Sequence, residues 1–168
     1  MKNIKTMTTA AVLITFGIVI PMFMPKILVP PASYTLASHV PVFVAMFISP
    51  IIAVMVALGT ALGFLLTTTP EIAARALSHV VFAYIGSLYI RKNKTLLTSL
   101  SKTIMFSATI SLIHVVFEII SITPFYFINN SNQSYINTII LLVGIGGFIH
   151  SIIDFYISVI IVKRVVQK

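Results

Sequence analysis

Three pairs of ionisable side chains lie four residues apart within otherwise apolar parts of the chain. The pairs are Arg75 with His79, His114 with Glu118, and His150 with Asp154. In an α-helix this spacing places both members of a pair on the same face. Guanidinium, imidazole and carboxylate groups arranged in this way can bind a charged ligand, relay a proton or neutralise one another. Because ionisable groups are costly inside a membrane, each pair marks a candidate functional position.

The composition indicates an integral membrane protein. Of the 168 residues, 58% are hydrophobic and only 8% are charged, whereas roughly 25% of the residues in soluble domains are charged. A spanning helix needs about 20 apolar residues, so we expect five or six helices in one membrane-embedded domain, residues 1–168. The net charge of +8 comes from basic residues at segment ends, which favours contact with anionic lipid and disfavours nucleic-acid binding.

The apolar runs and the prolines between them predict an all-α bundle of six transmembrane helices. The expected ranges are about 7–23, 36–49, 51–66, 71–90, 102–122 and 137–162. Pro30 and Pro31 exclude regular helix between the first two. Pro50 suits the first turn of the third helix, and the fifth helix is expected to end before Pro124.

The basic residues predict that both termini are cytoplasmic. Lys26 alone falls on the predicted outer side. The residues near the predicted inner ends are Lys2, Lys5, Arg91, Lys92, Lys94, Lys102, Lys163, Arg164 and Lys168. This asymmetry follows the positive-inside rule. A five-helix arrangement that merges the second and third helices would scatter the basic ends over both faces.

Counting depth along the helices brings several polar groups to one outer layer. At about 1.5 Å per residue, Arg75 and Glu118 lie roughly 6 Å below the outer surface. His79 and His114 follow about one turn deeper, and His39 belongs to the same layer at the start of the second helix. Tyr34 and Ser38 lie beside His39 in the sequence. We therefore predict a small-molecule site in an apolar cavity at this end of the bundle.

A structural alternative stays open for each pair. Arg75 and Glu118 can simply neutralise one another, because an unpaired charge in a membrane helix costs about 2.5–3.5 kcal/mol. Depth counting places His150 and Asp154 on the inner half, apart from the outer layer. There they can form a hydrogen-bonded pair, Asp154 can bond to another helix, or the two can relay protons.

The sequence does not predict a metal ion, a cofactor or an enzyme. The chain has no cysteine, and the four histidines show no recognisable metal-ligand spacing. Serine, histidine and aspartate are present by type, but the inferred depth of Asp154 separates it from the outer layer. Glycines at 59 and 63 lack the flanking residues of a nucleotide loop and instead predict a smooth face for helix packing.

Several motifs resemble those of the substrate-binding S components of energy-coupling factor (ECF) vitamin transporters. The similar segments are PPASYTLASHVP at 30–41, FISP at 47–50, ALGTALG at 57–63 and RALSH at 75–79. Together with the six basic-ended helices and the proline-rich first outer loop, they are similar to the niacin-type subgroup. The likeness covers the whole chain.

The resemblance implies high-affinity binding of a vitamin and its uptake across a bacterial plasma membrane. It implies a first outer loop that covers the ligand. Nicotinate is the best candidate, because its carboxylate would give Arg75 of the predicted site a partner and Tyr34 or Phe82 could stack on its ring. The implied partners are a transmembrane T component and two cytoplasmic ATPases, so the chain itself hydrolyses nothing. Small residues on the first helix contact the T component in this family, and the corresponding positions are Thr8, Ala11 and Thr15.

Other functions stay open at this point. The chain can be an S component for pyridoxine, hydroxymethylpyrimidine or pantothenate. It can also be a dimeric proton-coupled carrier with His150 and Asp154 as its relay, or a membrane scaffold without a ligand. Cobalt and nickel S components begin with Met-His, whereas this chain begins Met1-Lys2, which disfavours a metal substrate.

Overall fold

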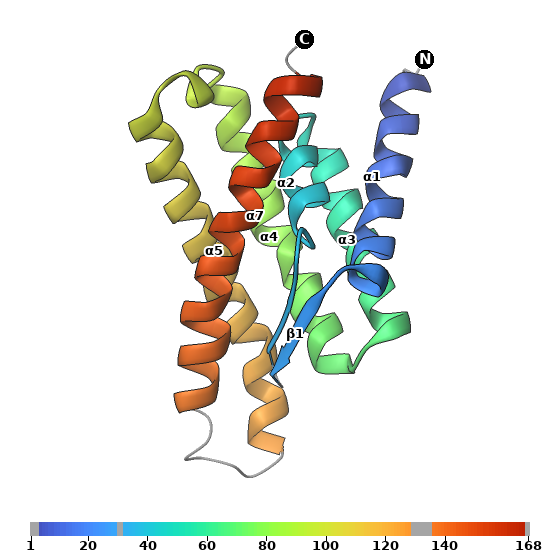
Figure 1. The fold of residues 1–168 in the computed structure, drawn as a ribbon, viewed down its shortest axis with the longest axis vertical. Helices are drawn as coiled ribbons and strands as arrows, with labels where there is room; N and C mark the ends of the chain where they lie inside the picture. Colours follow the sequence, from blue (N-terminus) through green and yellow to red (C-terminus); the bar gives the residue numbers. More distant parts are fainter. Residues whose placement is uncertain (1–3, 30–31, 129–135, 167–168) are drawn as a thin grey trace.

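The computed structural model describes residues 4–29, 32–128 and 136–166, and shows a helical bundle with one β-hairpin (Figure 1). Predictions that rest on Lys2, Pro30, Pro31 and Lys168 lie outside this range. The helices are α1 Ile4–Phe23, α2 Val40–Met46, α3 Pro50–Thr67, α4 Pro70–Lys92, α5 Leu100–Ile128 and α7 Gly147–Ile161. The short 3₁₀ helix η1 is Leu96–Thr98, and π-helical turns extend α7 at both ends as η2 Ile136–Gly146 and η3 Val162–Val166.

Five helical stretches among the described residues are long and apolar enough to cross a membrane. They are Ile4–Phe23, Pro50–Thr67, Pro70–Lys92, Leu100–Phe125 and Ile139–Val165. The expectation of a helical membrane protein is therefore confirmed. Both termini lie at one end of the bundle together with the α4–α5 connection, and the α3–α4 turn lies at the other (Figure 1).

The predicted second helix, 36–49, is wrong in its length. α2 has only 7 residues, about 10 Å of helix, and cannot cross a membrane. All seven of its residues are buried, so it is a short helix in the centre of the core. The apolar run is interrupted at Ala37, which adopts a left-handed conformation with φ 65°, and Pro41 then fixes the start of the helix.

The segment before α2, predicted to be irregular, forms an antiparallel hairpin. β1 Lys26–Val29 pairs with β2 Ala32–Thr35, with Lys26 opposite Thr35 and Val29 opposite Ala32. All four residues of β1 are exposed, whereas Ala32 and Thr35 of β2 are buried. The hairpin therefore lies against the bundle through one strand and brings the chain from α1 to the centre of the fold.

α5 continues through Pro124, where the sequence predicted its end. Proline lacks the N–H that would bond to the carbonyl one turn earlier. Membrane bundles tolerate this because neighbouring hydroxyls and helices satisfy the freed backbone groups.

The smooth face predicted on α3 is confirmed, and its partner is α1. A Cβ atom added to Gly63 would lie 3.0 Å from the Cα of Ile18, which is backbone and cannot rotate away. Gly17 of α1 faces Thr60 of α3 in the same contact. Backbone-to-backbone approach of this kind is how membrane helices pack without large side chains.

The Gly63→Ala substitution is expected to destabilise the protein by about 1–3 kcal/mol, because the methyl group forces α1 away from α3. The measurement is the apparent melting temperature in detergent. Gly144→Ala is the matched control, because its added Cβ would meet its nearest atom, the carbonyl oxygen of Ile139, at an ordinary 3.6 Å. Equal melting temperatures for the two variants would show that the close α1–α3 contact contributes no stability.

Candidate functional site

The carboxylate of Glu118 on α5 is the centre of one group of buried charges. Its Oε2 accepts a hydrogen bond from Nη2 of Arg75 at 3.0 Å, and its Oε1 lies 3.1 Å from Nε2 of His79. Nε2 of His114 lies 3.3 Å from Oε1 but outside hydrogen-bonding geometry. None of these four side chains is more than 7% exposed. The predicted meeting of α4 and α5 through these two pairs is therefore confirmed.

His39 connects this group to a second one. Its ring centroid lies 4.8 Å from that of His79, 4.7 Å from that of His114 and 5.0 Å from that of His150. His79 and His114 also contact each other, with centroids 4.8 Å apart. All four histidines of the chain thus form one contiguous cluster in the interior.

Asp154 on α7 binds the polypeptide at the start of α2. Its Oδ1 accepts from the backbone N–H of Ala37 at 3.0 Å, and its Oδ2 accepts from the backbone N–H of His39 at 2.9 Å. The same Oδ2 lies 3.0 Å from Nδ1 of His39 and 3.6 Å from Nε2 of His150. Because the N-cap residue of α2, His39, makes no side-chain cap bond, Asp154 satisfies the N–H of this residue, which a helix start leaves without a partner, together with that of Ala37 in the preceding turn.

The prediction that His150 and Asp154 lie apart from the other groups is wrong. Depth counting predicts His39 in one layer with His79 and His114, and the structure brings these three rings together. Its error is to place His150 and Asp154 on the other half of the bundle, because His39, carried by the hairpin and the short α2, contacts both of them as well. The alternative in which Asp154 bonds to another helix is confirmed by its contacts at the start of α2.

The hairpin forms one wall of the cluster. The Tyr34 hydroxyl donates a hydrogen bond to the carbonyl of Leu142 in η2. Burial raises the pKa of the Tyr34 phenol, so it keeps the proton for this bond. The contact depends on Gly146, because a Cβ atom there would collide with the Tyr34 phenol. The Ser38 hydroxyl lies 3.4 Å from Nδ1 of His39 and 3.3 Å from Nε2 of His150.

Phe82 of α4 packs against the histidines and is fully buried. Its ring centroid lies 4.8 Å from that of His114 and 5.5 Å from that of His79. On the other side it contacts Phe43 of α2 at 5.3 Å. Phe82 therefore connects the polar cluster to the aromatic core.

A small cavity of about 20 Å³ adjoins the cluster, close to the room that one water molecule needs. Its walls come from β2, the start of α2, α3, α4 and α5. The lining residues are Ser33, Ser38, His39, Phe64, Ile72, Arg75, Ala76, His79 and Glu118. Five of the eight predicted binding residues therefore line it, whereas Tyr34, Phe82 and His114 do not.

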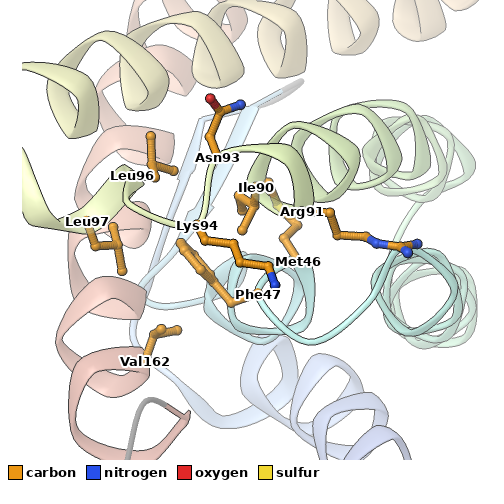
Figure 2. Close-up of a pocket in the computed structure, with 9 residues that line it drawn as sticks. All are labelled: Met46, Phe47, Ile90, Arg91, Asn93, Lys94, Leu96, Leu97 and Val162. Carbon is orange, nitrogen blue, oxygen red and sulfur yellow. The ribbon is translucent and has the colours of Figure 1, made fainter.

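A larger cavity of about 490 Å³ lies at the end of the bundle that carries the α4–α5 connection (Figure 2). Apolar side chains of α2, α4, η1 and η3 form most of its surface. Lys94 reaches across it, whereas Arg91 extends away (Figure 2). None of the predicted binding residues lines it. The smaller cavity is the better candidate for recognition, because convergent polar groups fix a ligand more specifically than volume does.

Sequence comparison now adds to this geometry. The chain is 37% identical over 160 residues to the niacin transporter NiaX of Lactococcus lactis subsp. cremoris (strain MG1363), which covers 93% of this chain and 72% of that protein. The chain belongs to the NiaX family. The resemblance to niacin-type S components is thereby confirmed. No family model matches the sequence, and no solved structure matches it.

Within this NiaX-family chain, sequence reasoning missed the part that Asp154, Ala37 and Leu142 play. The sequence marks Asp154 as an intramembrane carboxylate, but two of its partners are backbone N–H groups, which any residue provides. The carbonyl of Leu142 has no sequence signature for the same reason. The one available signal was the short apolar run before Pro50, which is hardly long enough for a full membrane helix.

Proposed function

We propose that this NiaX-family chain binds niacin in the form of nicotinate and mediates its uptake as an S component. The observation that carries the proposal is the 37% identity to a protein named as a niacin transporter, over 93% of this chain. The small cavity supports it, because a buried guanidinium, imidazoles and hydroxyls line it and can contact a small aromatic acid. The carboxylate of Glu118, which pairs with this guanidinium, lines the same cavity.

The proposed site assigns a role to each part of nicotinate. Arg75 receives the carboxylate, since its planar fork matches carboxylate geometry. The ring nitrogen meets the Ser38 hydroxyl or an imidazole of the cluster, and the ring packs against Tyr34 or Phe82. The complete set of proposed binding residues is Tyr34, Ser38, His39, Arg75, His79, Phe82, His114 and Glu118.

Entry of the vitamin requires movement, because a cavity of about 20 Å³ is far too small for a six-membered ring. We propose that the hairpin moves outward to admit nicotinate and then closes over it. The hairpin suits this motion, because β1 is exposed along its whole length and β2 alone packs against the bundle. The Tyr34 bond to Leu142 then holds the closed form.

Nicotinate is expected to bind at least tenfold more tightly than nicotinamide, a difference of about 1.4 kcal/mol. The reason is that Arg75 gains a charge-assisted bond only with the carboxylate. The measurement is equilibrium dialysis of the purified chain with radiolabelled nicotinate and unlabelled nicotinamide as competitor. If nicotinamide competed as well as unlabelled nicotinate, Arg75 would not be the partner of the carboxylate. Saturable binding of pyridoxine or pantothenate without binding of nicotinate would contradict the niacin proposal.

For transport, we propose the arrangement of an ECF importer in a bacterial plasma membrane. Both termini and the basic α4–α5 connection face the cytoplasm, with the hairpin and α2 taking the place of a sixth span. Thr8, Ala11 and Thr15 of α1 are exposed, so this small-residue face is open for the T component. Two cytoplasmic ATPases supply the energy, and this chain performs no catalysis of its own.

A proton-coupled carrier is the second candidate, favoured by the unbroken contact from Glu118 through the histidines to Asp154. Uptake in cells that carry or lack the T component and the ATPases separates the two. We expect no accumulation without them. Accumulation that persists without these partners and stops when the proton gradient is dissipated would select the carrier instead.

A further inference from the structure

Four side chains from three parts of the fold form a set of potential metal ligands. They are His39 before α2, His79 of α4, and His114 and Glu118 of α5, and all four are buried. Each offers one ligand atom, and these atoms all lie within 4.8 Å of one another. No spacing in the sequence could show this, because the three elements are brought together only by folding.

Two of the separations between these atoms are already near the value that a metal ion requires. Ligand atoms bound at about 2.0–2.2 Å to a tetrahedral zinc ion lie roughly 3.3–3.6 Å apart. In the structure, Oε1 of Glu118 lies 3.1 Å from Nε2 of His79 and 3.3 Å from Nε2 of His114. Small side-chain shifts would therefore be enough to place an ion between them.

Groups behind the ligands hold them in orientations suited to a metal. Nδ1 of His39 lies 3.0 Å from the carboxylate of Asp154, and this bond leaves Nε2 available for coordination. A carboxylate behind a histidine is the usual support of a metal-binding imidazole. Glu118 is supported likewise, because Arg75 binds its Oε2 and leaves Oε1 facing the imidazoles.

His114 provides a separate indication of a ligand. It is 1% exposed; its Nδ1 has no hydrogen-bond partner among the described residues, and its Nε2 has only the 3.3 Å contact with Oε1 of Glu118, outside hydrogen-bonding geometry. Leaving a buried polar nitrogen without a bond costs about 1–3 kcal/mol. Coordination through Nε2 would remove this cost on the side that faces His79 and Glu118.

We propose that His39, His79, His114 and Glu118 bind one divalent transition-metal ion of the zinc type. Three imidazoles and a carboxylate suit zinc, nickel and cobalt more than magnesium or calcium. The alternative set of His39, His150 and Asp154 is less suitable, because both oxygens of Asp154 already accept backbone N–H groups. The ion lies beside the small cavity, which three of its four ligands line.

The experiment uses the full chain in detergent, with any affinity tag removed and bound metal stripped with a chelator. Zinc binding is measured by competition with a chromophoric chelator, and cobalt binding by visible absorption, which is intense for tetrahedral coordination. We expect one equivalent of metal. His79→Gln and His114→Gln should each weaken zinc binding at least tenfold, whereas His150→Gln, outside the four ligands, should change it less than threefold.

Three results would overturn the proposal. They are less than a tenth of an equivalent of zinc in the wild-type chain, a non-tetrahedral cobalt spectrum, and loss of zinc binding in His150→Gln but not in His114→Gln. If a glutamine variant does not fold, stoichiometry and the cobalt spectrum of the wild-type chain decide. Nicotinate binding is measured in parallel on stripped protein, so that failure of the metal site and failure of the niacin proposal are recognised separately.

Discussion

Replacing Glu118 by Gln is expected to destabilise the protein by about 3–5 kcal/mol, the range for breaking a buried ion pair. The side chain keeps its size, so the loss comes from the charge. One carboxylate balances the guanidinium of Arg75 and contacts two imidazoles, and an amide cannot replace it. The measurement is thermal unfolding in detergent, compared with the wild-type chain.

The matched control is Glu71→Gln, which makes the same chemical change on a half-buried side chain in the first turn of α4. Its effect should stay within about 0.5 kcal/mol, as for other substitutions away from buried networks. The double variant Arg75→Gln, Glu118→Gln should be more stable than Glu118→Gln alone, because both buried charges are then removed together. If Glu118→Gln were as stable as Glu71→Gln, the carboxylate would not be needed to balance Arg75.

The parts of the fold that the sequence predicted are those governed by helical periodicity. Long apolar runs fix α1, α3, α4, α5 and α7, and the four-residue spacing fixes which side chains share a face. Counting depth along two such helices was enough to bring Arg75 of α4 to Glu118 of α5. The method works there because both helices are continuous from the membrane surface to the pair.

Depth counting groups His39 with His79 and His114 as the structure does, but it assumes a helix before His39 that the structure does not contain, and it misses the contacts of His39 with Asp154 and His150. An apolar run of moderate length fits a membrane helix, a buried short helix or a strand, and periodicity alone cannot distinguish them. The left-handed residue at the break is Ala37, and alanine gives no turn signal. The left-handed conformation costs about 1–2 kcal/mol, so tertiary contacts must stabilise it.

The short α2 explains why the polar cluster is contiguous. A helix that begins inside a bundle exposes backbone N–H groups where there is no water, and each must find a partner. Asp154 provides it, and the same carboxylate orients His39 toward the other imidazoles. Discontinuous helices are a recurring device of transporters for placing polar groups near the middle of the membrane.

Asp154→Ala is therefore expected to lower the free energy of unfolding by at least about 3 kcal/mol. It leaves the buried N–H groups of Ala37 and His39 without an acceptor, at about 1–3 kcal/mol each, and it also removes the bond to the His39 ring. Asp154→Asn, which keeps one acceptor oxygen, should lie between Ala and the wild-type chain. Thermal unfolding gives the order of stability. Hydrogen exchange at the two amides localises the loss to the start of α2.

Ser158→Ala is the matched control one turn further along α7, because Ser158 is also fully buried but donates only within its own helix, to the carbonyl of Phe155 at 2.6 Å. Its loss should cost less than about 1 kcal/mol. A proton relay predicts a different outcome, in which Asp154→Asn stops uptake while stability and amide exchange stay at wild-type values. That outcome would contradict the structural role. A cap requires only that the side chain keep its acceptor oxygens, whereas a relay requires a group that gains and loses a proton.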